Sequence, residues 1–123
     1  MPPATQTLAG RRILVIEDDY LVGLVLAELL QDAGAEIVGP IGWIEEAIAL
    51  IESGREKLDA AVLDVNLHGQ KSYPIADALI ARSVGFVFAT GYGASVIDSK
   101  YQAYPRCEKP FHQHTLLAAL ARA

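Results

Sequence analysis

The chain has 123 residues, of which 52% are hydrophobic and 20% are charged, and its formal net charge is −5. These values fit one compact domain and argue against the basic surface with which a protein follows a nucleic-acid backbone. A single cysteine, Cys107, excludes an internal disulfide and a multi-cysteine metal site, and we expect it to be a buried structural thiol. The first residues lack a signal-peptide core, and no apolar run approaches the roughly 18 residues that span a bilayer. We therefore expect a cytoplasmic protein that binds neither membrane nor nucleic acid.

Residues 1–10 are rich in Pro, Thr and Ala and show no periodicity, so we expect a flexible N-terminal tail followed by one domain over residues 11–123. Beyond Arg11, short runs rich in β-branched residues alternate with stretches of helical composition. The predicted strands are RILVIE (12–17), AEIVG (35–39), LDAAVLDV (58–65), GFVFAT (85–90) and YPRCEK (104–109), each followed by a helix. Because right-handed crossovers place helices on both faces of such a sheet, the predicted fold class is α/β, a doubly wound, five-stranded parallel sheet.

Glycines mark several boundaries of these elements. Gly34 is predicted to end the first helix, Gly39-Pro40 the second strand and Gly54 the second helix, while Gly85 opens the fourth strand.

The first predicted helix, residues 19–33, carries two apolar stripes. The expected core face holds Val22, Val25, Leu26, Leu29 and Ala33, and the opposite stripe holds Tyr20, Leu24 and Ala27. Two interpretations of the second stripe stay open. Scattered apolar residues are normal on protein surfaces, whereas anchors at this spacing also dock helices of a partner.

Polar side chains stand at the carboxyl ends of the predicted strands, where ligands bind to open parallel sheets. They are Glu17, Asp18 and Asp19 where the first strand ends, Asp64 at the end of the third, Thr90 at the end of the fourth and Lys109 at the end of the fifth. Each has an ordinary explanation by itself, such as an N-cap for Asp19 or a turn for Asp64. Together, crowded carboxylates need a cation, and an all-oxygen set suits Mg²⁺ or Mn²⁺. A lysine beside them indicates an anionic ligand as well.

This pattern closely resembles the receiver domain of bacterial two-component response regulators, a phosphoryl-accepting signalling domain of about this size. The resemblance covers residues 11–121 and rests on the segments ILVIEDD, LDVNLHG, FATGY and KPF. It implies the flavodoxin-like strand order 2-1-3-4-5, and a phosphoacceptor that catalyses only its own phosphorylation and dephosphorylation rather than an enzyme. The FATGY segment is similar to a minority group of receivers, several of which stand alone without an output domain, and we expect a stand-alone receiver here.

The resemblance also implies a role for each polar residue. Asp64 would accept the phosphoryl group, Thr90 would bond to it, Lys109 would pair with it, and Mg²⁺ would be bound by Glu17, Asp18, Asp64 and the main-chain carbonyl of Asn66. A carboxylate thus ends a buried strand because the nucleophile must be held rigidly toward phosphorus while a metal offsets its charge. Lys109-Pro110 is similar to the family's cis peptide, although the base rate for X-Pro bonds favours trans.

The implied partners are a sensor histidine kinase or a histidine phosphotransfer protein, together with a downstream protein target. We expect a monomer or a weak dimer, whose output passes through protein contacts or through phosphate shuttling.

Two departures from the family pattern bear on switching and metal binding. Arg106 stands three residues before Lys109, where receivers usually carry an aromatic switch residue, so we expect activation to pass through Thr90 and the Gly91-Tyr92-Gly93 loop. Glu17 replaces the commoner Asp and lengthens that metal-binding arm by one methylene.

Rival functions fit less well. A haloacid-dehalogenase-type phosphatase would carry its nucleophile after the first strand and a second Asp at the position of Asn66. A nucleotide-binding protein would need a glycine-rich phosphate motif that the sequence lacks. A degenerate receiver that only docks partners would not need the acidic residues, Asp64, Thr90 and Lys109. We expect His68, His112 and His114 to be surface histidines rather than metal ligands.

Overall fold

The computed structural model describes residues 7–91 and 97–123. A parallel sheet at its centre contains β1 (Arg12–Ile16), β2 (Glu36–Ile41), β3 (Ala60–Asp64), β6 (Gly85–Thr90) and β7 (Arg106–Glu108). Their spatial order is β2-β1-β3-β6-β7. Counting only these strands along the chain, the order is 2-1-3-4-5, so the predicted doubly wound fold is confirmed.

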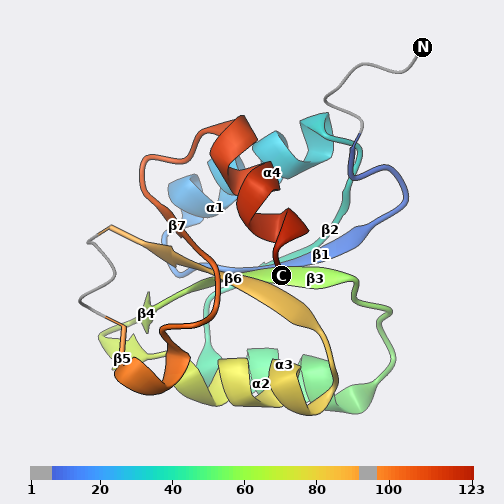
Figure 1. Ribbon diagram of the computed structural model, residues 1–123. Coiled ribbons are helices and arrows are strands. Elements are labelled where there is room, and N and C mark those ends of the chain that lie inside the picture. Colours follow the sequence, from blue (N-terminus) through green and yellow to red (C-terminus); the bar gives the residue numbers. More distant parts are fainter. Residues whose placement is uncertain (1–6, 92–96) are drawn as a thin grey trace.

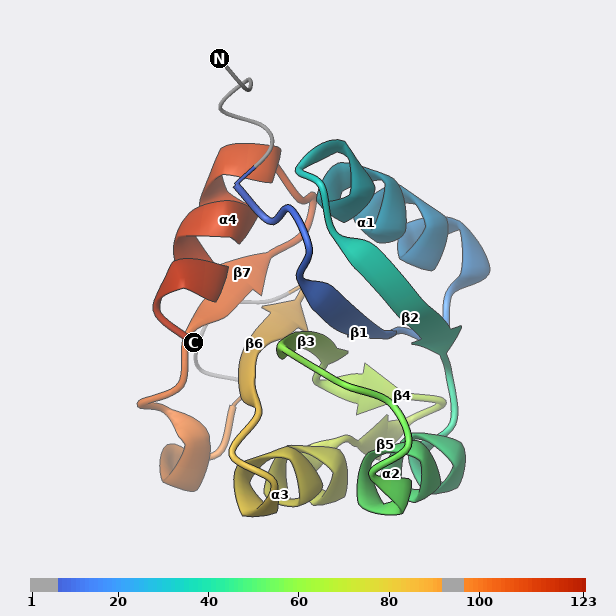
Figure 2. The same ribbon diagram turned by 90° about the vertical axis from the view of Figure 1, so that its right-hand side faces the viewer.

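Helices cover both faces of the sheet (Figures 1 and 2). One face carries α1 (Tyr20–Asp32) and α4 (Gln113–Ala121), and the other carries α2 (Ile44–Ser53) and α3 (Tyr73–Ala81). Alternate residues of β1 enter the two resulting cores: Ile13 and Val15 pack on the α1 and α4 side, whereas Leu14 and Ile16 pack on the other. A strand buried on both faces has to be apolar, as are the runs 13–16 of β1 and 86–89 of β6.

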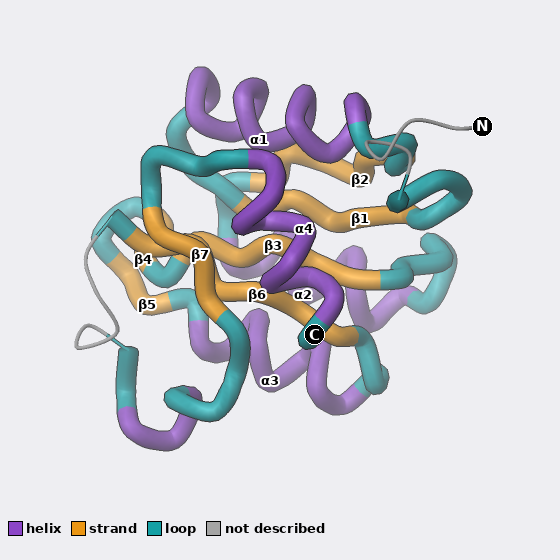
Figure 3. The backbone as a smooth tube through the Cα atoms, turned by 45° about the horizontal axis from the view of Figure 1, so that its top comes forward, coloured by secondary structure: helices purple, strands orange, loops and turns teal. Residues whose placement is uncertain are grey.

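The connections that follow β3 and β6 differ from the predicted ones. A hairpin of β4 (Asn66–Leu67) and β5 (Gln70–Lys71) lies beyond the carboxyl end of β3 (Figure 3). Between β6 and β7, the described residues 97–105 contain a single turn of 3-10 helix, Ser99–Tyr101, where a full helix was predicted. Residues 92–96 of this connection lie outside the described part of the chain.

The prediction that Gly39-Pro40 ends the second strand is wrong, because β2 continues to Ile41. β2 is an edge strand, where a proline without an N–H need not break a ladder. The register shifts between Leu14 and Ile16 of the neighbouring β1. Gly39 has a φ of +100°, and a Cβ there would lie 2.7 Å from the Val15 carbonyl oxygen, so glycine is required at this close approach.

The buried face of α1 is rotated relative to the predicted one. Ala27, predicted to lie on the outer stripe, is buried, whereas Val25, predicted for the core, is 53% exposed. The reason is the edge strand: a Cβ at Gly23 would lie only 3.0 Å from the Pro40 side chain, so the helix rests with Gly23 against β2. The exposed apolar residues of α1 are Tyr20, Leu21, Leu24 and Val25.

The ends of the domain are also defined by packing. Leu8, within the predicted tail, is buried, and its N–H donates to the Ala33 carbonyl at 2.7 Å, so the chain joins the core before the predicted start at Arg11.

Gly34 and Gly54 follow α1 and α2 with positive φ, and Gly85 opens β6, as predicted. Within the described residues, none of the helices has the length and apolar character needed to cross a membrane.

Candidate functional site

The predicted site residues meet at the carboxyl edge of the sheet. A pocket of about 500 Å³ is lined by Glu17, Asp18, Asp19, Val22, Asp64, Asn66, Thr90, Gly91 and Lys109. They come from the ends of β1, β3 and β6, from the first turn of α1, from the start of β4 and from the segment after β7, which the parallel order brings to one edge. Thus the structure brings together every residue to which the sequence assigned a phosphoryl or metal role.

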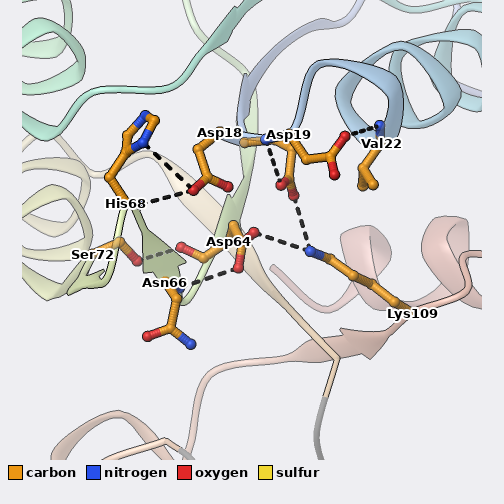
Figure 4. Close-up of polar contacts among 9 residues, drawn as sticks. Asp18, Asp19, Val22, Asp64, Asn66, His68, Ser72 and Lys109 are labelled. Carbon is orange, nitrogen blue, oxygen red and sulfur yellow. Dashed lines mark hydrogen bonds and ion pairs between the residues drawn. The ribbon is translucent and has the colours of Figure 1, made fainter.

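Asp64 ends β3 and is only 6% exposed. Its Oδ1 accepts the Asn66 N–H at 3.1 Å, and its Oδ2 lies 3.0 Å from Lys109 Nζ (Figure 4). Both carboxylate oxygens are therefore held, and the side chain has a defined direction into the pocket.

Ser72 is a site residue that sequence reasoning missed. It is fully buried, and its hydroxyl donates to the main-chain carbonyl of Asp64 at 2.5 Å, while its N–H donates to Val65 at 2.9 Å. It therefore anchors the end of β3 to the start of α3. The available signal, a serine just before Tyr73-Pro74, is typical of a helix N-cap and does not reveal this longer-range bond.

Lys109 reaches between two buried carboxylates, with Nζ 3.0 Å from Asp64 Oδ2 and 3.2 Å from Glu17 Oε2. Its N–H donates to the Thr90 carbonyl at 2.8 Å, and the Lys109-Pro110 peptide is cis, as the family resemblance implied. Burial alone would lower the pKa of Lys109, but the hydrogen bond and charge of Asp64, followed by those of Glu17, raise it. The lysine is therefore a permanent cation beside the Asp64 carboxylate.

Glu17 is 4% exposed, and burial, followed by its interactions with Asp64, raises its pKa from 4.5 to about 8. Its Oε1 accepts the Asp19 N–H at 3.1 Å, whereas the buried Oε2 has no hydrogen-bond partner among the described residues and lies 3.2 Å from the Lys109 ammonium. A buried carboxylate oxygen without a hydrogen-bond donor is suited to bind a cation.

Asp18 lies on the rim of the pocket. Burial alone would raise its pKa, but the His68 N–H, which donates to Asp18 Oδ2 at 2.8 Å, and neighbouring groups lower it (Figure 4). Asp18 is therefore ionised at neutral pH.

Together these residues fit a divalent metal. One carboxylate oxygen from each of Glu17, Asp18 and Asp64 lies within 4.8 Å of the others. Lys109 can offset only part of their charge, and hard oxygen ligands of this kind suit Mg²⁺.

Thr90 is buried at the end of β6 and lines the same pocket. Of the adjoining segment on which the switching prediction rests, Gly91 also lines the pocket, whereas Tyr92 and Gly93 lie outside the described residues. That prediction therefore stays a prediction.

Arg106, which stands in place of the usual aromatic residue, donates from its guanidinium to the Gln102 carbonyl at 2.5 Å. The buried aromatic ring of this region is Tyr101, which stacks on Tyr73 at 4.4 Å between centroids and meets Phe88 edge-on at 6.1 Å. The Arg106 side chain is therefore hydrogen-bonded to the residue that follows the 3-10 turn. This arrangement differs from that of an aromatic switch residue whose ring is free to change rotamer.

Among the described residues, the histidines and the cysteine lie outside the cluster of Glu17, Asp18 and Asp64. His112 and His114 are exposed, as predicted. His68 is exposed too, but it lies at the rim beside Asp18, a position that the sequence did not reveal. Cys107 is buried, as predicted, and burial raises the pKa of its thiol.

The raised pKa of Glu17 predicts how stability depends on pH without metal. The unfolded chain loses the Glu17 proton near pH 4.5, whereas the folded protein retains it up to about pH 8, so stability falls as the pH rises through this window. Glu17→Gln should flatten this dependence and exceed the parent in unfolding free energy at pH 9 by on the order of 2 kcal/mol. Urea unfolding in EDTA between pH 5 and pH 9 measures it, with the exposed Glu28→Gln as control. Equal pH slopes for parent and Glu17→Gln would contradict the assignment.

No family model matches the chain. Among solved structures, SdrG from Sphingomonas melonis Fr1 is 40% identical and has a TM-score of 0.79, with 90% of this chain and 96% of that chain covered. The receiver domain of the sensor histidine kinase PA1611 from Pseudomonas aeruginosa shares the fold, with a TM-score of 0.73 at 22% identity over 93% of this chain and 97% of that chain.

Among curated proteins, the transcriptional regulatory protein PdtaR of Mycobacterium tuberculosis is 30% identical in an alignment 119 residues long that covers 92% of this chain and 56% of that protein. The chain spans about half the length of the curated relatives that it matches. The strand order, the acidic pocket and the similarity to SdrG along nearly its whole length agree with one another. The chain belongs to the receiver-domain family of two-component response regulators.

Proposed function

We propose that this chain accepts a phosphoryl group on Asp64 from a histidine kinase or a histidine phosphotransfer protein, and that the phosphorylated form signals through contact with a downstream protein. The observation that supports this most directly is the Asp64 carboxylate itself. It is buried at a strand end, held at both oxygens, and placed in one pocket with Lys109 and Thr90. Rigid aim and nearby positive charge are the main requirements of phosphoryl transfer.

In the proposed reaction, a carboxylate oxygen of Asp64 forms a bond to phosphorus while the bond from phosphorus to the donor imidazole nitrogen breaks. The nitrogen keeps that electron pair, and the acyl phosphate remains on the chain. Lys109 then pairs with a phosphoryl oxygen, and the Thr90 hydroxyl donates to another. These groups would let the domain promote its own phosphorylation and dephosphorylation, with a residue of the chain itself as the phosphoryl acceptor.

Glu17, Asp18, Asp64 and the main-chain carbonyl of Asn66 would hold Mg²⁺, and Mn²⁺ would suit the same oxygen ligands. The bound cation would neutralise charge that builds up on the phosphoryl oxygens. The structure of the PA1611 receiver domain has a magnesium ion coordinated in its active-site cleft, which supports this assignment by analogy. A cytoplasmic location belongs to the same proposal, in keeping with the free thiol of Cys107.

Labelling with acetyl phosphate tests the proposed function without a partner protein. The chain should gain the mass of one phosphoryl group in the presence of Mg²⁺ and none in EDTA. Phosphorylation without metal, or steady turnover of a phosphate ester in place of a labelled chain, would contradict it. The latter result would favour the phosphatase alternative.

The metal assignment predicts a second result. Mg²⁺ should raise the melting temperature by mass action, because it binds the folded chain and relieves repulsion among the carboxylates. Asp18→Ala should remove most of this rise, and the exposed Asp32→Ala should leave it unchanged. If Asp18→Ala bound Mg²⁺ as tightly as the parent, the site would be wrongly placed.

The donor's docking surface is part of the same proposal. Leu21, Val25, Pro110 and Phe111 line an apolar groove that adjoins the acidic pocket and shares Lys109 with it. Leu21 is 71% exposed. A donor histidine has to come within bonding distance of Asp64, so the protein that carries it must cover the neighbouring surface. This groove replaces the predicted stripe of Tyr20, Leu24 and Ala27, since Ala27 is buried.

Leu21→Asp tests the groove. Transfer from a sensor kinase that phosphorylates the parent should slow by about tenfold, because an apolar anchor becomes charged. Labelling by acetyl phosphate should be unchanged, since a small donor needs no docking surface, and unfolding free energy should change by less than about 0.5 kcal/mol. Ile80→Asp, an exposed site on the opposite face of the sheet, is the matched control. Transfer at the parental rate to a stable Leu21→Asp chain would exclude this surface.

A further inference from the structure

Two aromatic rings from distant segments stack at the rim of the acidic pocket. Trp43 lies at the start of α2 and remains 58% exposed, and His68 lies at the turn of the β4–β5 hairpin. Their ring centroids are 3.8 Å apart, and the ring planes are inclined by 12°. Figure 2 shows the hairpin beside the segment that joins β2 to α2. The stack therefore connects two loops that the sheet order alone does not join.

Asp18 lies between these two loops. On one side, the His68 N–H donates to its Oδ2 at 2.8 Å. On the other side, the backbone at Gly42, just before Trp43, is so close that a Cβ there would be 3.3 Å from Asp18 Cα. Asp18 thus has a contact with each of the two segments that the ring stack holds together.

The hairpin that carries His68 has little structure of its own to hold it. It contains only the pairs Asn66–Lys71 and Leu67–Gln70, and His68 adopts a φ of +50°, which is uncommon for a residue other than glycine. Asn66, whose carbonyl is a proposed metal ligand, begins the same hairpin. A contact that fixes the hairpin therefore fixes both a donor to Asp18 and a ligand carbonyl.

We propose that the Trp43–His68 stack is a positioning device for the metal site. It holds the hairpin so that the His68 N–H orients Asp18 and the Asn66 carbonyl keeps its place, and it thereby sets the affinity for Mg²⁺. The inference rests on the proposed function, in that Asp18 and Asn66 are taken as metal ligands. Neither ring belongs to the proposed ligand set, and the Lys109–Asp64 contact involves neither of them.

Mg²⁺ titration calorimetry at one fixed pH tests the stack, with the parent, Trp43→Ala, His68→Ala and the double variant. Each single variant should bind Mg²⁺ about three- to tenfold more weakly, as expected for the loss of an aromatic pair. The double variant should be no weaker than either single one, because the two rings act as one unit. Trp43→Phe and His68→Phe keep two stacked rings and should bind nearly as the parent does.

Several results would overturn the inference. One is that either single variant binds Mg²⁺ with the parental affinity. Another is that the losses of affinity add up in the double variant. A third is that His68→Phe binds Mg²⁺ as weakly as His68→Ala does. The last result would assign the effect to the imidazole rather than to stacking. A lower metal-free melting temperature with unchanged Mg²⁺ affinity would show a merely structural role and would also overturn it.

Two further measurements separate this inference from the proposed function. Trp43 is the only tryptophan of the chain, so its emission should change on Mg²⁺ binding in the parent. Binding detected by calorimetry without any change in emission would contradict the coupling of stack and site. Labelling by acetyl phosphate at saturating Mg²⁺ should be complete in all stack variants. A parent that binds no Mg²⁺ would instead refute the metal site of the proposed function.

Discussion

Asp64→Asn should abolish labelling by acetyl phosphate and by any histidine donor, with the fold retained. The amide is nearly isosteric with the carboxylate, so it can occupy the same place beside Asn66 and Lys109, but it lacks the nucleophilic oxygen that has to bond to phosphorus. Intact mass after acetyl phosphate treatment measures the effect, which should be a complete loss of the added phosphoryl mass.

The matched control is Asp32→Asn, which changes an exposed aspartate at the end of α1 and should be labelled like the parent. Circular dichroism of Asp64→Asn establishes that the chain is folded. A phosphoryl adduct of undiminished yield on Asp64→Asn would show that the acceptor is another residue.

Lys109→Met should lower the unfolding free energy of the metal-free protein more than any other substitution proposed above. Lys109 Nζ lies about equally close to two buried carboxylates, at 3.0 Å from Asp64 and 3.2 Å from Glu17, and the variant leaves both without their ammonium. Breaking a buried ion pair on one side strands the remaining charge, so the unfolding free energy at pH 8 in EDTA should fall by about 2 to 3 kcal/mol.

The loss should depend on pH and metal in a defined direction. At pH 5 Glu17, whose pKa is already raised to about 8, is protonated in the folded chain, so the deficit of Lys109→Met should be smaller there. Saturating Mg²⁺ should also recover part of it. Urea unfolding measures both effects, with the exposed Lys57→Met as control. A Lys109→Met chain as stable as the parent at pH 8 in EDTA would show that the carboxylates do not depend on this lysine.

Tertiary packing decided how α1 lies on the sheet. The apolar spacing of this helix is compatible with more than one buried face. The prediction therefore placed Val25 in the core and Ala27 on the surface, whereas the structure has the reverse. The edge strand β2 decides between the faces, because Pro40 contacts the helix at Gly23, where the missing side chain allows close approach. Periodicity within one helix contains no information about a neighbour that approaches from another strand.

The continuation of β2 past Gly39-Pro40 has a similar cause. Gly and Pro are strong signals for the end of a strand, but they are local signals. The position of β2 at the sheet edge removes the need for a proline N–H, so the strand passes through the pair and ends at Ile41.

The sequence by itself determined which groups are available for chemistry and where along the strands they stand. Buried parallel strands must be apolar, so a carboxylate such as Asp64 can stand only at a strand end, and all such ends meet at one edge of a parallel sheet. Only the tertiary structure decided what supports the pocket: Ser72 beneath Asp64, and the Trp43–His68 stack beside Asp18. These contacts join segments separated in sequence, and their geometry depends on the packing of the loops rather than on the spacing of residues along the chain.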